Sequence, residues 1–210
     1  IPPLPYRGAG VKPAPVSKFL CAVALVVLVP SLGAQRLLGD NWPQWRGPSG
    51  DGICGEQDIP VTWSRSENVA WTLPLPGRGG ATPAVWGDRG FLTSVDGEDL
   101  LLTCLGADGK ELWRRTVSTG NRIVRSDEGD SASPSPTTDG KHVWAMMATG
   151  DIACFDFDGN EVWNRDLDEN YGPFHIQFGM TSTPVLYEDR LLFQFIHGEM
   201  RGPREEAFVL

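Results

Sequence analysis

Few groups of residues in this sequence have the types and spacing that chemistry requires. Asp156, Asp158 and Asn160 alternate as the first ligands of a calcium-binding loop do. Glu161 then stands where such a loop needs a glycine, and Leu167 stands where it needs its final glutamate. The pattern therefore predicts a hairpin turn, and we assign no metal ligands.

The residues that commonly carry catalysis are scattered. His142, His175 and His197 have no partner at the short spacing typical of metal ligands. Residues 77–82, Gly-Arg-Gly-Gly-Ala-Thr, precede a predicted strand, so they lack the helix N-terminus that binds phosphate. The G-x-S-x-G pattern of a strained nucleophile turn does not occur. We therefore assign no catalytic residue.

Binding residues are predicted in the loops that precede the inner strands, because function in a repeated β fold is usually carried by loops. The candidates are Arg78, Arg125, Asp127, His175 and Gln177. The alternative is that each is an ordinary solvated loop residue. Trp42, Trp45 and Arg46 form a second candidate, as a cation–π cluster that grips a ligand. A structural clasp is favoured for them, because they lie outside the repeat described next.

An internal repeat positions these residues. Segments beginning with Ala-Thr-Pro at 81, Ala-Ser-Pro at 132 and Ser-Thr-Pro at 182 are spaced by 51 and 50 residues. The stretches ADGKELWRR (107–115) and FDGNEVWNR (157–165) are also 50 residues apart. A fixed period of this length indicates a repeat architecture.

Each repeat unit predicts four short antiparallel strands. In the first unit they are expected at 82–86, 91–95, 100–105 and 111–117, with Asp-Gly turns between apolar runs. Four strands per unit of about 50 residues predict a blade of a β-propeller. The fold class is therefore all-β, an incomplete propeller of about 2.5 blades with a closing strand at 68–75. Trp113 and Trp163 are expected to fill the gap between neighbouring sheets. Trp71 and the turn glycines Gly109 and Gly159 are also assigned structural roles.

These repeats resemble the PQQ-like (pyrroloquinoline quinone-like) β-propeller family, in which a strand, an Asp/Gly turn and a Trp end each unit. CLGADGKELW and CFDFDGNEVW carry the likeness, and NWPQWRGPSGDGI at 41–53 resembles the start of an exported bacterial subgroup. The resemblance covers about 41–210. It implies a ring of about seven or eight blades, so the chain is expected to be a fragment.

The resemblance also raises the possibility of PQQ as cofactor. Quinone-dependent dehydrogenases of this type hold it with adjacent cysteines, a stacking Trp and a calcium ion. The four cysteines here, Cys21, Cys54, Cys104 and Cys154, include no adjacent pair. No cofactor is therefore assigned, and PQQ is kept as a minority hypothesis.

The N-terminus predicts export. Lys12 and Lys18 precede the apolar run 19–30, and small residues follow it at Gly33 and Ala34. This order is typical of a secretory signal peptide and leaves no stable membrane span after cleavage. The expected organisation is an upstream segment and signal peptide at 1–34, an extension or clasp at 35–67 and a partial propeller at 68–210. Its units are expected at about 76–120, 130–170 and 178–210.

The composition narrows the choice of function. A net charge of −9 argues against binding nucleic acid. We expect a periplasmic or secreted binding or scaffold module of the bacterial cell envelope. Its partner would be a protein, a peptide or a polysaccharide. The alternatives are a PQQ-dependent dehydrogenase and an outer-membrane protein assembly factor.

Overall fold

The computed structural model describes residues 40–57, 59–121, 129–172, 180–195 and 208–209. The chain divides into two units, residues 1–36 and 37–210, and every described residue belongs to the second. The predicted signal peptide at 1–34 therefore lies outside the described residues. Within the described part of the chain, no helix has the length and apolar character needed to cross a membrane.

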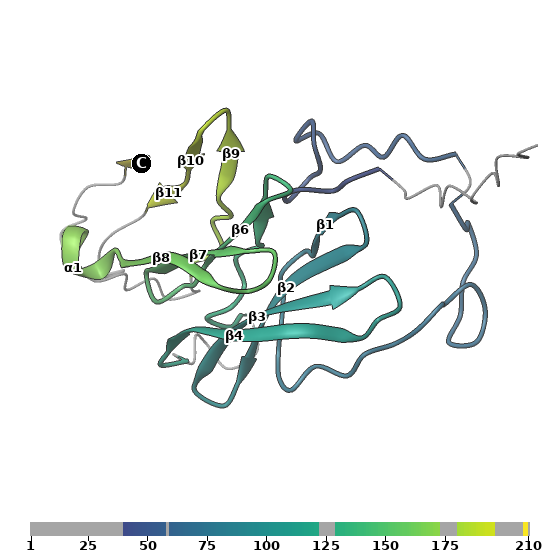
Figure 1. Ribbon diagram of the computed structural model, residues 1–210, viewed down its shortest axis with the longest axis horizontal. Coiled ribbons are helices and arrows are strands. Elements are labelled where there is room, and N and C mark those ends of the chain that lie inside the picture. The colour runs from purple at the N-terminus through teal and green to yellow at the C-terminus, as the bar shows by residue number, and fades with distance from the viewer. Residues whose placement is uncertain (1–39, 58, 122–128, 173–179, 196–207, 210) are drawn as a thin grey trace, which may run out of the picture. The chain divides into compact units, whose positions relative to one another are not determined.

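The first sheet contains four antiparallel strands in chain order: β1 (Ala84–Trp86), β2 (Arg89–Asp96), β3 (Asp99–Gly106) and β4 (Glu111–Thr119) (Figure 1). Six successive residues of β3, from Leu100 to Leu105, are buried. A strand covered on both faces has apolar residues at successive positions, which is why this one reads Leu-Leu-Leu-Thr-Cys-Leu. The four strands predicted for this unit are confirmed.

The second sheet repeats the first. It contains β5 (Thr137–Thr138), β6 (His142–Met146), β7 (Asp151–Asp156) and β8 (Glu161–Asp166), again antiparallel and in chain order. One bulge position repeats as well, because the register shifts after Cys104 in β3 and after Cys154 in β7. A helix of one turn, α1 (Asp168–Tyr171), follows β8. The fold class is therefore almost entirely β, as predicted.

The third unit contains shorter strands. β9 (Val185–Tyr187) pairs with β10 (Arg190–Leu192), and β11 (Gln194–Phe195) pairs with β12 (Phe208–Val209). All of these pairs are antiparallel. β10 and β11 are separated by one residue, so together they take the place of the second strand of the other units, between β9 and β12. The described residues thus hold two four-stranded blades and part of a third.

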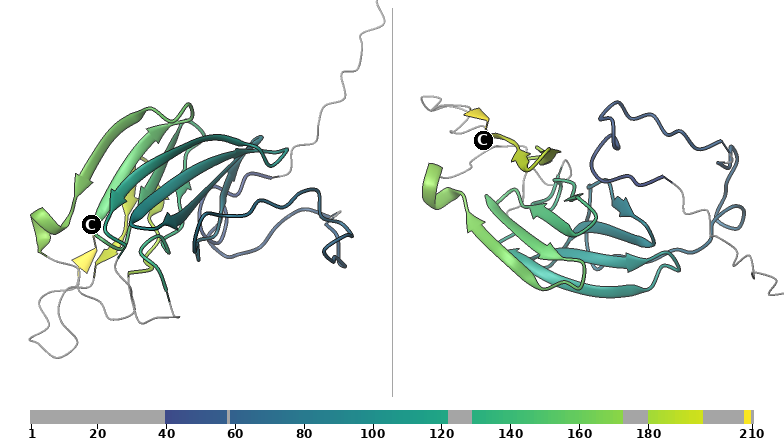
Figure 2. Two further views of the ribbon diagram at one scale, coloured as in Figure 1. Left: turned by 90° about the horizontal axis from the view of Figure 1, so that it is seen from below. Right: turned by 45° about the horizontal axis from the view of Figure 1, so that its top comes forward.

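The two complete sheets lie side by side (Figure 2). The main hydrophobic core contains buried residues of both sheets. Trp113 on β4 is 8% exposed, and its ring centroid lies 6.2 Å from that of Phe155 on β7. Phe91 on β2 packs against Phe157, with centroids 5.0 Å apart. Apolar side chains of both sheets fill the interface, so each blade buries a face that it cannot cover by itself.

Trp113 also makes a specific contact with the next blade. Its indole N–H donates to the carbonyl of Phe157 (2.8 Å), and its ring lies over Gly159. A Cβ at Gly159 would come within 2.8 Å of the indole, and Gly159 has φ +79°. Glycine is required here for both reasons, because the left-handed conformation and the close ring each exclude a side chain.

The closing strand predicted at 68–75 is wrong: these residues form no strand. Trp71 nevertheless donates its indole N–H to the carbonyl of Ala107 (2.9 Å) and lies over Gly109, as Trp113 does one unit later. A strand needs a partner to satisfy its backbone groups, and no described residue pairs with 68–75. The side-chain contact therefore forms without the strand.

Candidate binding site

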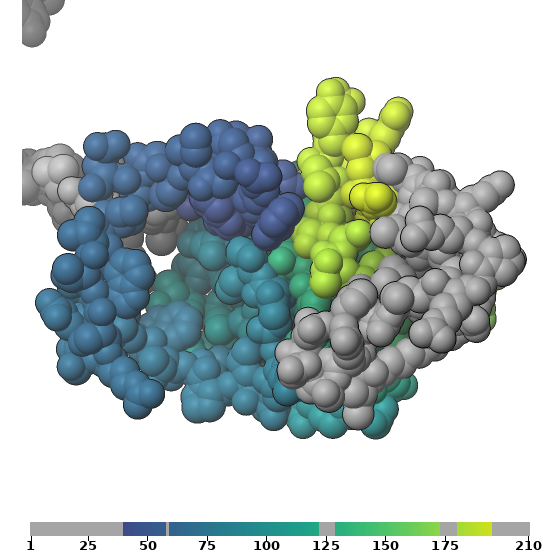
Figure 3. Space-filling model, turned by 180° about the vertical axis from the view of Figure 1, so that it is seen from behind, coloured from purple at the N-terminus to yellow at the C-terminus, as the bar shows by residue number. Residues whose placement is uncertain are grey.

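A short segment before the sheets, residues 41–47, which we call the strap, crosses the first strand of all three units. Its backbone bridges β1 and accepts a hydrogen bond from β5, and a side-chain oxygen accepts one from β9. The bonds join Trp42 N–H to the Val85 carbonyl and Val85 N–H to the Trp42 carbonyl (both 2.8 Å), Thr138 N–H to the Pro43 carbonyl (2.8 Å) and Leu186 N–H to Gln44 Oε1 (3.1 Å). Figure 3 shows the strap, in purple, beside the third unit, in yellow-green.

A tight turn at the end of the strap presents Trp45. The N–H of Gly47 donates to the carbonyl of Gln44 (2.9 Å), and Arg46 takes a left-handed conformation with φ 66°. Gly47 lies against the ring of Trp42, where a Cβ would come within 2.8 Å of a ring carbon. Trp45 remains 53% exposed, and the Arg46 guanidinium lies 5.6 Å from its ring centroid. Trp42 is thus packed structurally, whereas Trp45 is held out in the open.

A hollow of about 1120 Å³ lies next to the strap. Its wall includes the repeated segments that lead into β1, β5 and β9, with the equivalent hydroxyl residues Thr82, Ser133 and Thr183. Trp45 lines the hollow from the strap, and Arg78 lines it from the loop before β1. The repeat therefore places the same kind of hydroxyl side chain in the wall three times.

Hydrogen bonds between the units hold this wall. The Thr82 N–H donates to Ser135 Oγ (2.9 Å), and the Ser135 N–H donates to Thr183 Oγ1 (3.1 Å). Thr93 donates its hydroxyl to the carbonyls of Ala132 (2.8 Å) and Pro134 (3.0 Å). Each unit is thus tied to the next through a Ser/Thr-Pro segment, so the lining is fixed before any ligand arrives.

An open space lies beside Asp130 and Ser133. Asp130 is 8% exposed, and its Oδ1 accepts a hydrogen bond from the N–H of Ala132 (2.8 Å). A Cβ at Gly80 would lie 3.7 Å from Ser133 Oγ and 4.0 Å from Asp130 Oδ2, which is ordinary contact without a clash. The absence of a side chain at Gly80 therefore leaves room next to these two oxygens.

The predicted binding residues have different outcomes. Arg78 lines the hollow, and its carbonyl accepts a hydrogen bond from the N–H of Val95 (2.8 Å). Arg125, Asp127, His175 and Gln177 lie outside the described residues. In the sequence, the Ser/Thr-Pro segments served only to align the repeats. Their recurring hydroxyl groups are the signal from which this lining could have been predicted.

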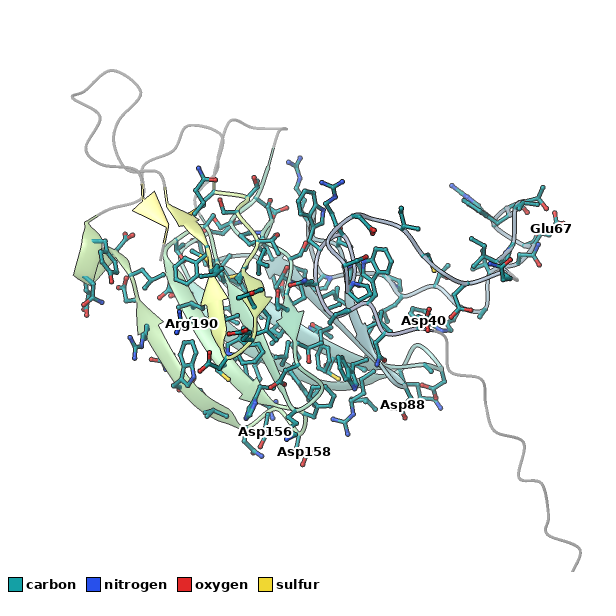
Figure 4. All side chains as sticks on the ribbon, turned by 90° about the horizontal axis from the view of Figure 1, so that it is seen from above. Asp40, Glu67, Asp88, Asp156, Asp158 and Arg190 are labelled. Atoms are coloured by element: carbon teal, nitrogen blue, oxygen red, sulfur yellow. The ribbon has the colours of Figure 1, made fainter. Side chains whose placement is uncertain are left out.

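The calcium-like stretch forms the turn between β7 and β8, where Figure 4 labels Asp156 and Asp158. Asp156 Oδ1 accepts hydrogen bonds from the N–H groups of Asp158 (2.9 Å) and Asn160 (2.8 Å), and Oδ2 accepts one from the Asn160 side chain (2.8 Å). These bonds, led by that of the Asn160 side chain, lower the pKa of Asp156. The carboxylate is therefore engaged in closing the turn.

The described residues do not fit the quinone cofactor. Cys104 and Cys154 lie in different sheets, and burial raises the pKa of each thiol to about 11. Cys54 is exposed and lies in neither sheet. In the part of the chain that the structure describes, no three His, Cys, Asp or Glu side chains are arranged to hold a metal ion. We derive no reaction step through PQQ.

Trp163 lines a second, smaller hollow. It is partly buried on β8, and with Trp144, Tyr171 and Phe193 it borders a space of about 670 Å³ beside the third unit. The Arg165 guanidinium lies 5.9 Å from its ring centroid. This space lies between the second sheet and the strands that follow it, so we treat it as part of the packing between blades.

Comparisons with solved structures find proteins to which part of this chain is similar. BamB from Moraxella catarrhalis is 21% identical, with a TM-score of 0.47, and the alignment covers 60% of this chain and 39% of that one. The quinohemoprotein alcohol dehydrogenase from Comamonas testosteroni is 17% identical, with a TM-score of 0.42 over 56% of this chain and 17% of that one. The chain thus spans well under half the length of either protein. No curated protein matches the sequence.

A family model described as "Outer membrane protein assembly factor BamB" matches residues 56–204. The match includes both complete sheets and most of the third unit. Repeated four-stranded sheets, with a Trp over the next turn, agree with a propeller built from PQQ-like repeats. The chain therefore belongs to the BamB family of PQQ-like β-propellers.

Proposed function

We propose that this protein is an exported binding or scaffold module of the bacterial cell envelope, and that it binds through the hollow beside the strap. The observation that carries the proposal is the fixed polar wall, in which Thr82, Ser133 and Thr183 recur with the repeat. Concave sites with a few well-placed polar groups are the usual places where ligands bind.

The charge distribution supports binding more than catalysis at this place. Arg78 and Asp130 are the charged side chains among the described residues that line the hollow. The buried Cys104 and Cys154 belong to the sheets and are absent from its lining. The described lining of the hollow therefore supplies hydrogen-bonding groups, and no nucleophile paired with a base is assigned there.

Placement in the envelope rests on two supports. The N-terminal segment has the order of a secretory signal peptide, and the description of the matching family refers to the outer membrane. Separation of cytoplasm, periplasm and membranes from the producing bacterium tests this, with the protein expected in an envelope fraction. Recovery from the cytoplasm alone contradicts the proposal.

A role in assembling outer-membrane proteins is a second candidate, favoured by the description of the family. The partner would then be another protein. This role and the binding of a smaller ligand use the same fold but leave different products in a crosslinking experiment.

The test places a photoreactive phenylalanine analogue at Thr82, inside the hollow, in the protein as it is made in the cell. A matched control carries it at Leu112, which lies on β4 and is 51% exposed. We expect a covalent adduct from position 82 and none from position 112. Protein-containing adducts would favour the assembly role. Equal labelling at both positions, or none, would refute binding through the hollow.

A further inference from the structure

We propose that the ligand of the hollow is an uncharged carbohydrate, stacked on Trp45 and hydrogen-bonded by the groups around Gly80. This inference rests on the proposed function, because it names the ligand class of the same hollow.

The first support is the manner in which Trp45 is held. The strap is bonded to three units, so its backbone is fixed, yet the ring of Trp45 is 53% exposed and lines the hollow. A large apolar ring held in solvent contributes little to the stability of the fold, and it is available to cover an apolar surface of a ligand. The face of a pyranose ring that carries C–H groups is such a surface.

The second support is the balance of donors and acceptors. Sugar hydroxyls both donate and accept hydrogen bonds, and the hydroxyl of Thr82 in the lining offers both functions. Thr183 Oγ1 accepts from the Ser135 N–H and keeps its own proton to donate. The Ser133 hydroxyl donates to the Asp130 carbonyl and accepts from the Asp130 N–H, so it offers a ligand an acceptor. Asp130 adds acceptors and Arg78 adds donors. Among the described residues of the lining these are the two charged side chains, and their charges are opposite.

The third support is space. The hollow, at about 1120 Å³, exceeds the roughly 300–1,000 Å³ of ordinary small-molecule sites. Gly80 leaves the room beside Asp130 Oδ2 and Ser133 Oγ open. A short oligosaccharide fits a site of this size better than a monosaccharide does.

A bound peptide is disfavoured by the strap. An extended peptide commonly binds by adding a strand to a free sheet edge. At this place the edge of β1 already pairs with Trp42 through two hydrogen bonds, and β5 and β9 each donate one hydrogen bond to the strap. The chain's own segment therefore occupies the edge positions that a peptide would use.

The experiment measures binding of neutral oligosaccharides to the purified protein by titration calorimetry, with maltotetraose, cellotetraose, chitotetraose and xylotetraose as probes. We expect at least one probe to bind. Trp45→Ala should weaken that binding about tenfold through loss of the stacking platform, and Trp45→Phe should restore part of it.

Gly80→Leu is the blocking variant, because the new side chain fills the room beside Asp130 while Gly80 has no positive φ to strain. Gly90→Leu is its matched control, since Gly90 on β2 also lacks a positive φ and has nothing within 4 Å of an added Cβ. We expect Gly80→Leu to abolish binding and Gly90→Leu to leave it within about twofold. Circular dichroism establishes that each variant is folded.

Each other outcome overturns the inference. Binding that survives both Trp45→Ala and Gly80→Leu would place the sugar elsewhere, and failure of all four probes would refute an uncharged carbohydrate ligand. If an unfolded outer-membrane protein peptide binds instead and Gly80→Leu abolishes it, the carbohydrate is wrong but binding through the hollow stands. The crosslinking experiment tests the proposed function separately, because it does not depend on the ligand class.

Discussion

Trp71 and Trp113 make the same contact in two different surroundings. Each indole lies over a turn glycine with positive φ, Gly109 for Trp71 and Gly159 for Trp113. Each donates its N–H to the carbonyl two residues before that glycine, at 2.9 Å and 2.8 Å. Trp113 belongs to β4, its side chain packs between the two sheets, and it is 8% exposed. Trp71 belongs to a segment without regular secondary structure and is 42% exposed.

The difference separates a local property of the repeat, the contact between Trp and Gly, from one that needs a neighbouring sheet, the burial of the indole. The Trp-over-Gly contact needs only a turn and an indole, so it forms at both places. Burial of the indole needs a second sheet behind it, which Trp113 has in β5–β8. The hydrophobic gain grows with the apolar area removed from water, so the two tryptophans should contribute very different amounts to stability.

The largest expected effect is that of Trp113→Ala. Truncation leaves a cavity in the core between the sheets, and the Phe157 carbonyl loses its indole donor. We expect a loss of about 3–5 kcal/mol in the free energy of unfolding, measured by urea denaturation. Trp113→Phe keeps an aromatic ring and should lose less. A loss below that of Trp71→Ala would contradict the comparison.

Gly159→Ala should rank second. It forces a side chain into the left-handed region, which costs about 1–2 kcal/mol. It also pushes a methyl group into the indole of Trp113, which costs a further ~1–3 kcal/mol. Gly97→Ala isolates the first part, because Gly97 has φ +61° and nothing within 4 Å. Denaturation of both variants gives the contact by difference. Equal losses would show that the indole simply moves aside.

Trp71→Ala should cost about 1–2 kcal/mol, since a ring that is 42% exposed removes less area from water. An added Cβ at Gly109 would approach the ring of Trp71 even more closely than one at Gly159 approaches Trp113. Gly109→Ala should nevertheless destabilise less than Gly159→Ala, because the ring of Trp71 is 42% exposed and can move toward solvent at the cost of its hydrogen bond to Ala107. Thermal melts of these variants beside their Trp113 and Gly159 counterparts provide the measurement. A Trp71→Ala loss as large as that of Trp113→Ala would mean that the irregular segment is as firmly packed as a blade.

The smallest expected effect concerns the turn beneath Trp113. Hydrogen bonds, first that from Asn160, hold the pKa of Asp156 below its ordinary value of about 4. The folded pKa is the lower one, so the stabilisation is complete above the unfolded pKa and is lost as pH falls through the folded pKa. Asp156→Asn should therefore destabilise the protein at pH 7 and make little difference at pH 2. An equal loss of stability at pH 7 and pH 2 would show that the ionised carboxylate of Asp156 does not stabilise the turn.

Local pattern alone predicted most of the fold. The Asp-Gly turns, the apolar runs between them and the 50-residue spacing led to the four strands of each complete sheet, because hairpins form between residues close in sequence. The strand predicted at 68–75 failed for the complementary reason. Its pattern was that of a strand, but pairing depends on a neighbour that sequence pattern does not supply.

The site was predicted less well, because it is assembled from distant segments. Arg78 was named from its loop, but the role of Trp45 depends on bonds from the strap to β1, β5 and β9, the longest of which spans 142 residues. Nothing local marks Gln44 as the partner of Leu186.

By itself, the sequence determined the blade: its strands, its turns and the tryptophan that lies over the next glycine, all set within about 50 residues. Only the tertiary structure decided that the strap, the space beside Gly80 and the segments that lead into β1, β5 and β9 lie together. The physical reason is that turn chemistry and strand pattern act between near neighbours, whereas a hollow is formed by surfaces brought together when the sheets bury their apolar faces.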